Sequence, residues 1–131
     1  MKKNYLVILL VFCLLFSNVS LALTNGILVD DYFEDAYAYL GSNRKLEISA
    51  TTKFLVYSIQ VTSCELWVKN GSTWSFSKYL DTPNTITYNN DFYNSSINYT
   101  SSDFGAGTYK ILVRITADGH TISVFSNIRT F

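Results

Sequence analysis

The feature that most constrains this chain is an alternation of apolar and polar residues that recurs from residue 45 to residue 128. In "TYKILVRIT", Tyr109, Ile111, Val113 and Ile115 share one parity, and Lys110, Arg114 and Thr116 share the other. A period of two places alternate side chains on opposite faces of a β-strand. Tyr, Phe, Thr, Val and Ile, which favour pleated surfaces, are abundant beyond residue 22. The chain therefore predicts an all-β domain.

Turn signals divide the alternating segments into about seven predicted strands. Asp118-Gly119 and Asn70-Gly71 each lie between two such segments, where a tight hairpin needs residues that tolerate positive φ. Pro83 marks a longer connection over Asp81–Asp91, because proline donates no ladder hydrogen bond. Strands this frequent predict an antiparallel β-sandwich. The predicted strands are Phe33–Tyr39, Lys45–Lys53, Ile59–Lys69, Thr73–Tyr79, Tyr93–Thr100, Thr108–Ala117 and Thr121–Arg129.

The first 22 residues have the anatomy of a secretory signal peptide. Lys2 and Lys3 precede an unbroken apolar run, Tyr5–Phe16, that is shorter than the roughly 20 residues needed to span a bilayer. Ser20 and Ala22 are small residues at the positions that signal peptidase reads. We expect a signal peptide over residues 1–22 and one secreted, extracellular domain over residues 23–131, without membrane insertion after cleavage. An uncleaved membrane anchor is the alternative.

Charge and cysteine content narrow the classes of partner. The chain has 10 basic and 10 acidic residues, and removal of Lys2 and Lys3 would leave a small acidic excess. Such a chain has no field to attract nucleic acid, so no nucleic-acid partner is expected. Cys64 is the only cysteine beyond the predicted signal peptide, and its apolar parity in "SCELWV" predicts a buried thiol. A reactive thiol or a dimer cross-link are the alternatives.

Two short segments resemble immunoglobulin-type sandwiches. In "DFGAGTYKI", Asp103 and Tyr109 resemble a tyrosine corner, with Ile111 where the disulfide cysteine would stand. "ELWVKNG" resembles the third strand, but its parity places Trp67 on the outer face, opposite Cys64, Leu66 and Val68.

A longer resemblance covers most of the chain beyond residue 22. The segments "RKLEISATT", "IQVTSCELWVKNGSTW" and "FYNSSINYTSSDFGAGTYKILVRITADGHTISVFSNIRT" together resemble small secreted immunoglobulin-like proteins of Gram-positive bacteria. The resemblance implies an immunoglobulin-like β-sandwich and a bacterial source. It transfers no catalytic or binding residues, because that family has no assigned function.

Catalytic chemistry finds little support in these residues. His120 is the only histidine and follows the Asp118-Gly119 turn, where no nucleophile is expected to converge on it. One His and one Cys do not complete a zinc site. We therefore expect no enzyme, no catalytic residue and no cofactor. The acidic segment "DDYFED" is a weak calcium candidate without the spacing of a calcium loop; its carboxylates are Asp30, Asp31, Glu34 and Asp35.

The remaining candidate is an aromatic surface in and near "YNNDFYNSSINYTSSDFG". Tyr combines a flat apolar ring with a polar tip, and with Asn and Ser it builds adaptable binding surfaces. Sugar rings can stack and hydrogen-bond on such a surface, whereas ordinary cross-strand packing is the alternative. The candidate binding residues are Trp67, Trp74, Tyr88, Phe92, Tyr93 and Tyr99.

These observations predict an exported, non-catalytic binding or adhesive module whose partner is a glycan or a protein on a cell surface. The alternative is a structural or self-assembling extracellular protein that pairs through its edge strands. An enzyme using Asp31, Glu34 or Asp103 is the third reading. The pattern leaves the oligomeric state open.

Overall fold

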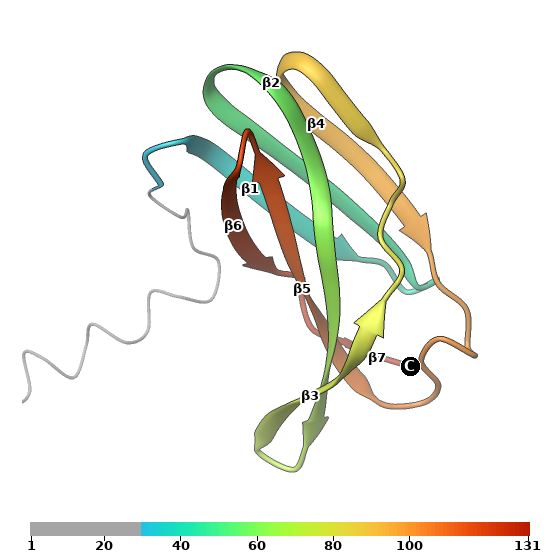
Figure 1. Ribbon diagram of the computed structural model, residues 1–131. Helices are drawn as coiled ribbons and strands as arrows, with labels where there is room; N and C mark the ends of the chain where they lie inside the picture. Colours follow the sequence, from blue (N-terminus) through green and yellow to red (C-terminus); the bar gives the residue numbers. More distant parts are fainter. Residues whose placement is uncertain (1–29) are drawn as a thin grey trace, which may run out of the picture.

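The computed structural model describes residues 30–131, so the predicted signal peptide and the start of the predicted domain lie outside the described residues. The described chain forms an antiparallel sheet of seven strands that is partly curled (Figure 1). The predicted all-β class and antiparallel pairing are confirmed. Within residues 30–131 no helix is both long and apolar enough to cross a membrane. The strands are β1 (Phe33–Leu40), β2 (Lys45–Asn70), β3 (Thr73–Leu80), β4 (Ile86–Asn98), β5 (Thr108–Ala117), β6 (His120–Phe125) and β7 (Arg129–Thr130).

Strand β2 is central to the sheet. The prediction of two strands, Lys45–Lys53 and Ile59–Lys69, is wrong, because both belong to one continuous strand. The first half of β2 lies between β1 and the end of β4. Its second half lies between β5 on one side and β3 with the start of β4 on the other. The pairing with β4 jumps from Thr51 to Val56, so β2 bends there without ending.

The curl brings the inner faces of both halves of β2 onto one core. Strand β1 lies beside β6 across the curl (Figure 1). Burying one such aliphatic side chain stabilises the fold by roughly 1.5–3 kcal/mol, so this core is the main source of stability. Its fully or almost fully buried aliphatic and thiol side chains include Leu46, Ile48, Ile59, Cys64, Leu66, Ile111, Val113 and Ile115.

The two predicted hairpins are present, one of them shifted by a residue. Between β5 and β6, Asp118 has φ 46° and Gly119 has φ 88°, as a turn with two positive-φ central residues requires. Between β2 and β3, Asn70 still pairs with Thr73, so the turn consists of Gly71 (φ 62°) and Ser72. The assignment of Asn70 to the turn is wrong because its backbone remains in the ladder.

The long connection predicted over Asp81–Asp91 is also wrong beyond residue 85. Strand β4 begins at Ile86, which pairs with Gln60 of β2. Most side chains in the first half of β4 are exposed, so this half carries little apolar alternation to reveal a strand. The final predicted strand, Thr121–Arg129, is divided into β6 and β7.

At the corner before β5, a hydrogen bond joins a tyrosine side chain to the backbone three residues upstream. Tyr109 is buried at the start of β5, and its phenol donates to the carbonyl oxygen of Ala106 at 3.2 Å. Ile111, two residues later, is fully buried in the core. The predicted parity of the third strand is confirmed for Cys64 and Leu66, which are buried, whereas Val68 and Trp67 are both half-buried.

Candidate functional site

The six predicted binding residues do not form one surface, and two of them are in the core. Tyr93 is 0% exposed and Tyr99 is 6% exposed, so their predicted exposure is wrong. Their phenols donate to the backbone carbonyl oxygens of Thr85 at 3.3 Å and Asp81 at 2.7 Å. Burial raises the pKa of both phenols. A buried ring offers no face to a ligand, so these two tyrosines serve packing.

The other four candidates lie in three places. Trp67 and Trp74 are half-buried on the outer face of β2 and β3. Tyr88 is exposed, with its ring 5.9 Å from that of Tyr57 near the bend of β2. Phe92 is exposed on β4 and lines a separate concavity.

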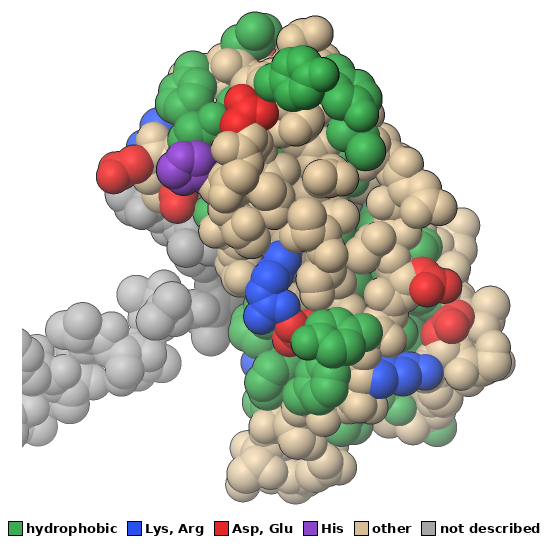
Figure 2. Space-filling view, in the orientation of Figure 1, with side chains coloured by type: hydrophobic (Ala, Val, Ile, Leu, Met, Phe, Trp, Pro, Cys, Tyr) green, Lys and Arg blue, Asp and Glu red, His purple; other side chains and the backbone are tan. Residues whose placement is uncertain are grey.

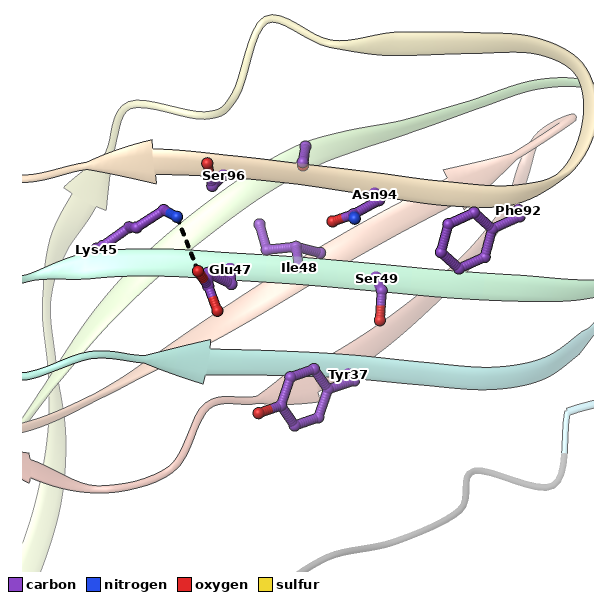
Figure 3. Close-up of a pocket in the computed structure, with 9 residues that line it drawn as sticks. Tyr37, Lys45, Glu47, Ile48, Ser49, Phe92, Asn94 and Ser96 are labelled. Atoms are coloured by element: carbon purple, nitrogen blue, oxygen red, sulfur yellow. Dashed lines mark hydrogen bonds and ion pairs between the residues drawn. The ribbon is translucent and has the colours of Figure 1, made fainter.

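This concavity, which we call the trough, lies on the outer face of β1, β2 and β4 and has a volume of about 570 Å³. Figure 3 shows Tyr37 of β1 and Phe92 of β4 on opposite sides of Ser49, which belongs to β2. The pairing register explains the shape: Tyr37 is opposite Ser49, and Ser49 is opposite Asn94. Ser49 is short, whereas Tyr37 on one side and Phe92, which is opposite Thr51, on the other carry large rings, so β2 forms the floor. The lining residues are Tyr37, Lys45, Glu47, Ile48, Ser49, Phe92, Asn94, Ser95 and Ser96.

The two aromatic walls of the trough, Tyr37 and Phe92, are exposed to solvent. Tyr37 is 49% exposed and Phe92 is 47% exposed. The ring of Tyr37 lies nearly parallel to the ring of Tyr39, with their centroids 6.4 Å apart and an interplanar angle of 7°. Arg129 in turn donates to the Tyr39 phenol at 2.6 Å. This chain of contacts orients the Tyr37 wall.

The floor of the trough is polar and carries both signs of charge. Lys45 Nζ lies 2.8 Å from Glu47 Oε1, and both side chains are partly exposed. The amide of Asn94 and the hydroxyl of Ser49 lie between this ion pair and Phe92 (Figure 3). The trough thus presents donors and acceptors between two aromatic rings. That combination suits a ligand with apolar faces and a hydroxyl rim.

The acidic segment does not assemble a metal site. Asp30 accepts hydrogen bonds from the backbone N–H groups of Tyr32 and Phe33 at 2.7 and 3.1 Å, which lower the pKa of its carboxyl. Asp31, Glu34 and Asp35 are exposed. Within residues 30–131 no three His, Cys, Asp or Glu side chains are grouped so that they could hold a metal ion. Asp30 therefore serves the start of β1.

The histidine and the cysteine are placed as follows. The ring of His120, an exposed residue at the start of β6, stacks on Tyr32 with centroids 4.2 Å apart.

Cys64 is 0% exposed, which confirms the predicted buried thiol. Burial raises the pKa of this thiol to about 11.

Sequence reasoning missed most of the trough. Tyr37 lies in "AYAYL", where its alternation with Ala36 and Ala38 could have placed it on an outer face. Ser49 and Asn94 gave no signal, because their importance comes only from being opposite one another in the register.

Comparisons with protein-family models, with curated proteins and with solved structures found no match.

Proposed function

We propose that this chain is an exported, non-catalytic binding module that takes a saccharide in the trough. The observation that carries the proposal is the pair of exposed rings, Tyr37 and Phe92, on either side of a hydrogen-bonding floor. A sugar ring has apolar C–H faces and a rim of hydroxyls, so it can contact the walls and bond to the floor at once.

The size of the trough suits a small ligand such as a saccharide. Pockets for small molecules have volumes of roughly 300–1,000 Å³. The trough has a volume of about 570 Å³ and its central residue, Ser49, is small. One or a few sugar units match those dimensions.

The export and the finer architecture belong to the same proposal. Export rests on the signal-peptide pattern of residues 1–22. An immunoglobulin-like sandwich is supported by the hydrogen bond from Tyr109 to Ala106 and by the shared core of the two halves of β2. In such a sandwich the trough lies on the outer face of one layer.

Self-assembly through edge strands is less well supported. Strand β3 pairs with β2 alone among the described strands, and its side chains are almost all exposed. However, β3 carries Lys78, and its register with β2 shifts between Leu66 and Trp67. Charge and irregularity are devices that prevent edge-to-edge pairing. Sedimentation at rising concentration tests this alternative, which requires a concentration-dependent oligomer.

A glycan array followed by calorimetry tests the trough. The chain is expressed with its own N-terminus and recovered after export, and the glycan that it retains is titrated. We expect Tyr37→Ala and Phe92→Ala to weaken binding at least tenfold, about 1.4 kcal/mol each. Ser49→Trp, which would fill the floor, should abolish binding. Tyr88→Ala is the matched control, because Tyr88 is an exposed aromatic residue of β4 outside the trough.

Two results would refute the site. One is glycan binding that survives all three trough variants. The other is a loss with Tyr88→Ala as large as the loss with Tyr37→Ala. Thermal melting of each variant shows whether a loss of binding reflects a loss of fold.

A further inference from the structure

A second surface, distinct from the trough, lies on the outer face of β3, the second half of β2, β5 and β6. We call it the aromatic face. The Trp67 ring is 6.4 Å from Phe76 and 6.0 Å from Phe125, and Phe76 is 5.2 Å from Tyr79. In the view of Figure 2, hydrophobic side chains gather over the lower part of the molecule, where β3 lies. Its aromatic residues are Trp67, Trp74, Phe76, Tyr79 and Phe125.

Much of this apolar surface is open to solvent. Phe76 is 45% exposed, Tyr79 is 69% exposed and Phe125 is 43% exposed. Contiguous exposed aromatic residues are uncommon on proteins without a partner for them. The rings are tilted steeply relative to one another, since Phe76 and Phe125 make angles of 77° and 84° with Trp67. Neighbouring rings of this face therefore do not share one plane.

The aromatic face also carries a free cation. Lys110 Nζ lies 3.9 Å from the Phe125 ring centroid and 4.7 Å from the Trp74 ring centroid. Contacts of this kind hold an ammonium group over the rings by cation–π attraction. Among the ion pairs of the described residues, none involves Lys110. No carboxylate among the described residues therefore neutralises this ammonium group, and its partial burial between the rings lowers its pKa.

The local charge differs from that of the whole chain, whose formal net charge is zero. Lys69, opposite Trp74, adds another cation beside Lys110. Arg114 is paired with Glu65, a carboxylate that is only 5% exposed. Because that pair is neutral, the aromatic face keeps an excess of positive charge.

A row of hydroxyls continues the face beyond the rings. Thr62 and Thr116 hydroxyl oxygens are 3.1 Å apart, and those of Thr116 and Thr121 are 2.8 Å apart. The row crosses β2, β5 and β6, next to the Arg114–Glu65 pair. The aromatic rings, the Lys110 ammonium group and the threonine hydroxyls thus lie next to one another across β3, β2, β5 and β6.

We propose that the aromatic face binds an acidic polysaccharide, with a uronate carboxylate on Lys110 and sugar rings against the exposed aromatic side chains. The excess of positive charge selects an anionic ligand over a neutral one. The extent of the face suits a polymer, in contrast to the short saccharide proposed for the trough. The two sites use different residues and different parts of the sheet, so neither depends on the other.

Affinity electrophoresis tests this proposal with polygalacturonate in the gel and with neutral dextran in a parallel gel. We expect polygalacturonate to retard the exported chain and dextran to leave it unretarded. Lys110→Gln and Trp74→Ala should each weaken the retardation at least fivefold, and added salt should weaken it further. Lys53→Gln is the control for charge, because Lys53 is an exposed lysine of β2 near the bend. Near-ultraviolet circular dichroism checks the fold of each variant.

Several outcomes would overturn the proposal. These are no retardation by polygalacturonate, equal retardation by dextran, and an unchanged affinity of folded Lys110→Gln. Tyr37→Ala separates the two sites: it should lose the ligand of the trough and keep the affinity for polygalacturonate. Each proposal can therefore fail without the other.

Discussion

The phenol of Tyr109 donates a hydrogen bond to Ala106, and the ring of Tyr109 covers the space where a Cβ on Gly107 would lie. Gly107 also exchanges two backbone hydrogen bonds with Phe131, at 3.0 and 2.9 Å. Its φ of 153° is one that L side chains rarely adopt. This corner thus joins the start of β5 to the end of the chain without a disulfide.

Gly107→Ala should destabilise the protein by about 3 kcal/mol, because strain at a glycine conformation and a steric clash act together. The new Cβ would lie 2.7 Å from the Tyr109 hydroxyl oxygen. Urea unfolding measures the loss. Gly71→Ala is the control: Gly71 also has a positive φ, of 62°, but no atom lies within 4 Å of the added Cβ. It should cost only about 1 kcal/mol, and equal losses for the two variants would contradict the role of the corner.

Strands could be predicted from the sequence where apolar and polar residues alternate clearly. The predicted bounds of β5 agree with the structure, because its apolar residues alternate clearly in the sequence. The structure buries every second residue from Tyr109 to Ala117. Strand β2 was divided in the prediction, because "KFLVYS" loses the alternation where the strand bends. The bend depends on long-range pairing with β4 and β5, which a local pattern does not contain. The break between β6 and β7 also depends on a long-range contact. Just after β6 ends, the Ser126 hydroxyl accepts a hydrogen bond from the backbone N–H of Ile111 at 2.9 Å.

The candidate site was harder to predict than the fold. In "NNDFYNSS" both parities look polar or aromatic, so nothing local shows that Tyr93 points inward while Phe92 points outward. A shift of one residue in a strand exchanges the two faces. Glu65 illustrates the same limit, because it shares the outer parity with Trp67 and yet is buried beside Arg114.

Arg114→Met should destabilise the protein by about 2–4 kcal/mol, because it leaves the Glu65 carboxylate buried without its cation. Trp67 Nε1, 3.4 Å from Glu65 Oε2, is a weak substitute for that cation. Chemical denaturation gives the loss, and the double variant Glu65→Leu with Arg114→Met should recover most of it. Lys45→Met removes an exposed ion pair and should cost at most about 1 kcal/mol. If the two single variants lose the same stability, the buried pair has no special role.

Cys64 should resist alkylation in the folded protein. Its side chain is 0% exposed, and burial raises the pKa of the thiol to about 11, so little thiolate exists at pH 8. Mass spectrometry after iodoacetamide treatment should show an unmodified chain in buffer and full modification in guanidinium chloride. Rapid labelling of the native protein would contradict the buried position, as would a disulfide-linked dimer.

The carboxylate of Asp118 should make stability depend on pH. It accepts hydrogen bonds from the backbone N–H groups of Tyr57 and Ser58, each at 2.9 Å, and these bonds lower its pKa below the ordinary value of 3.8. A carboxyl whose pKa is lower in the folded state stabilises the fold above the unfolded pKa. That contribution is lost as the pH falls from 3.8 through the folded pKa.

Asp118→Asn tolerates the same positive φ but carries no charge, so it should melt at a lower temperature than wild type at pH 7. The difference should narrow as the pH falls below 3.8, whereas Asp31→Asn, a change at an exposed carboxylate, should follow the wild type at both ends of the range. A gap between wild type and Asp118→Asn that stays constant from pH 7 to pH 2 would show that the charge of Asp118 does not stabilise the β2–β5 junction.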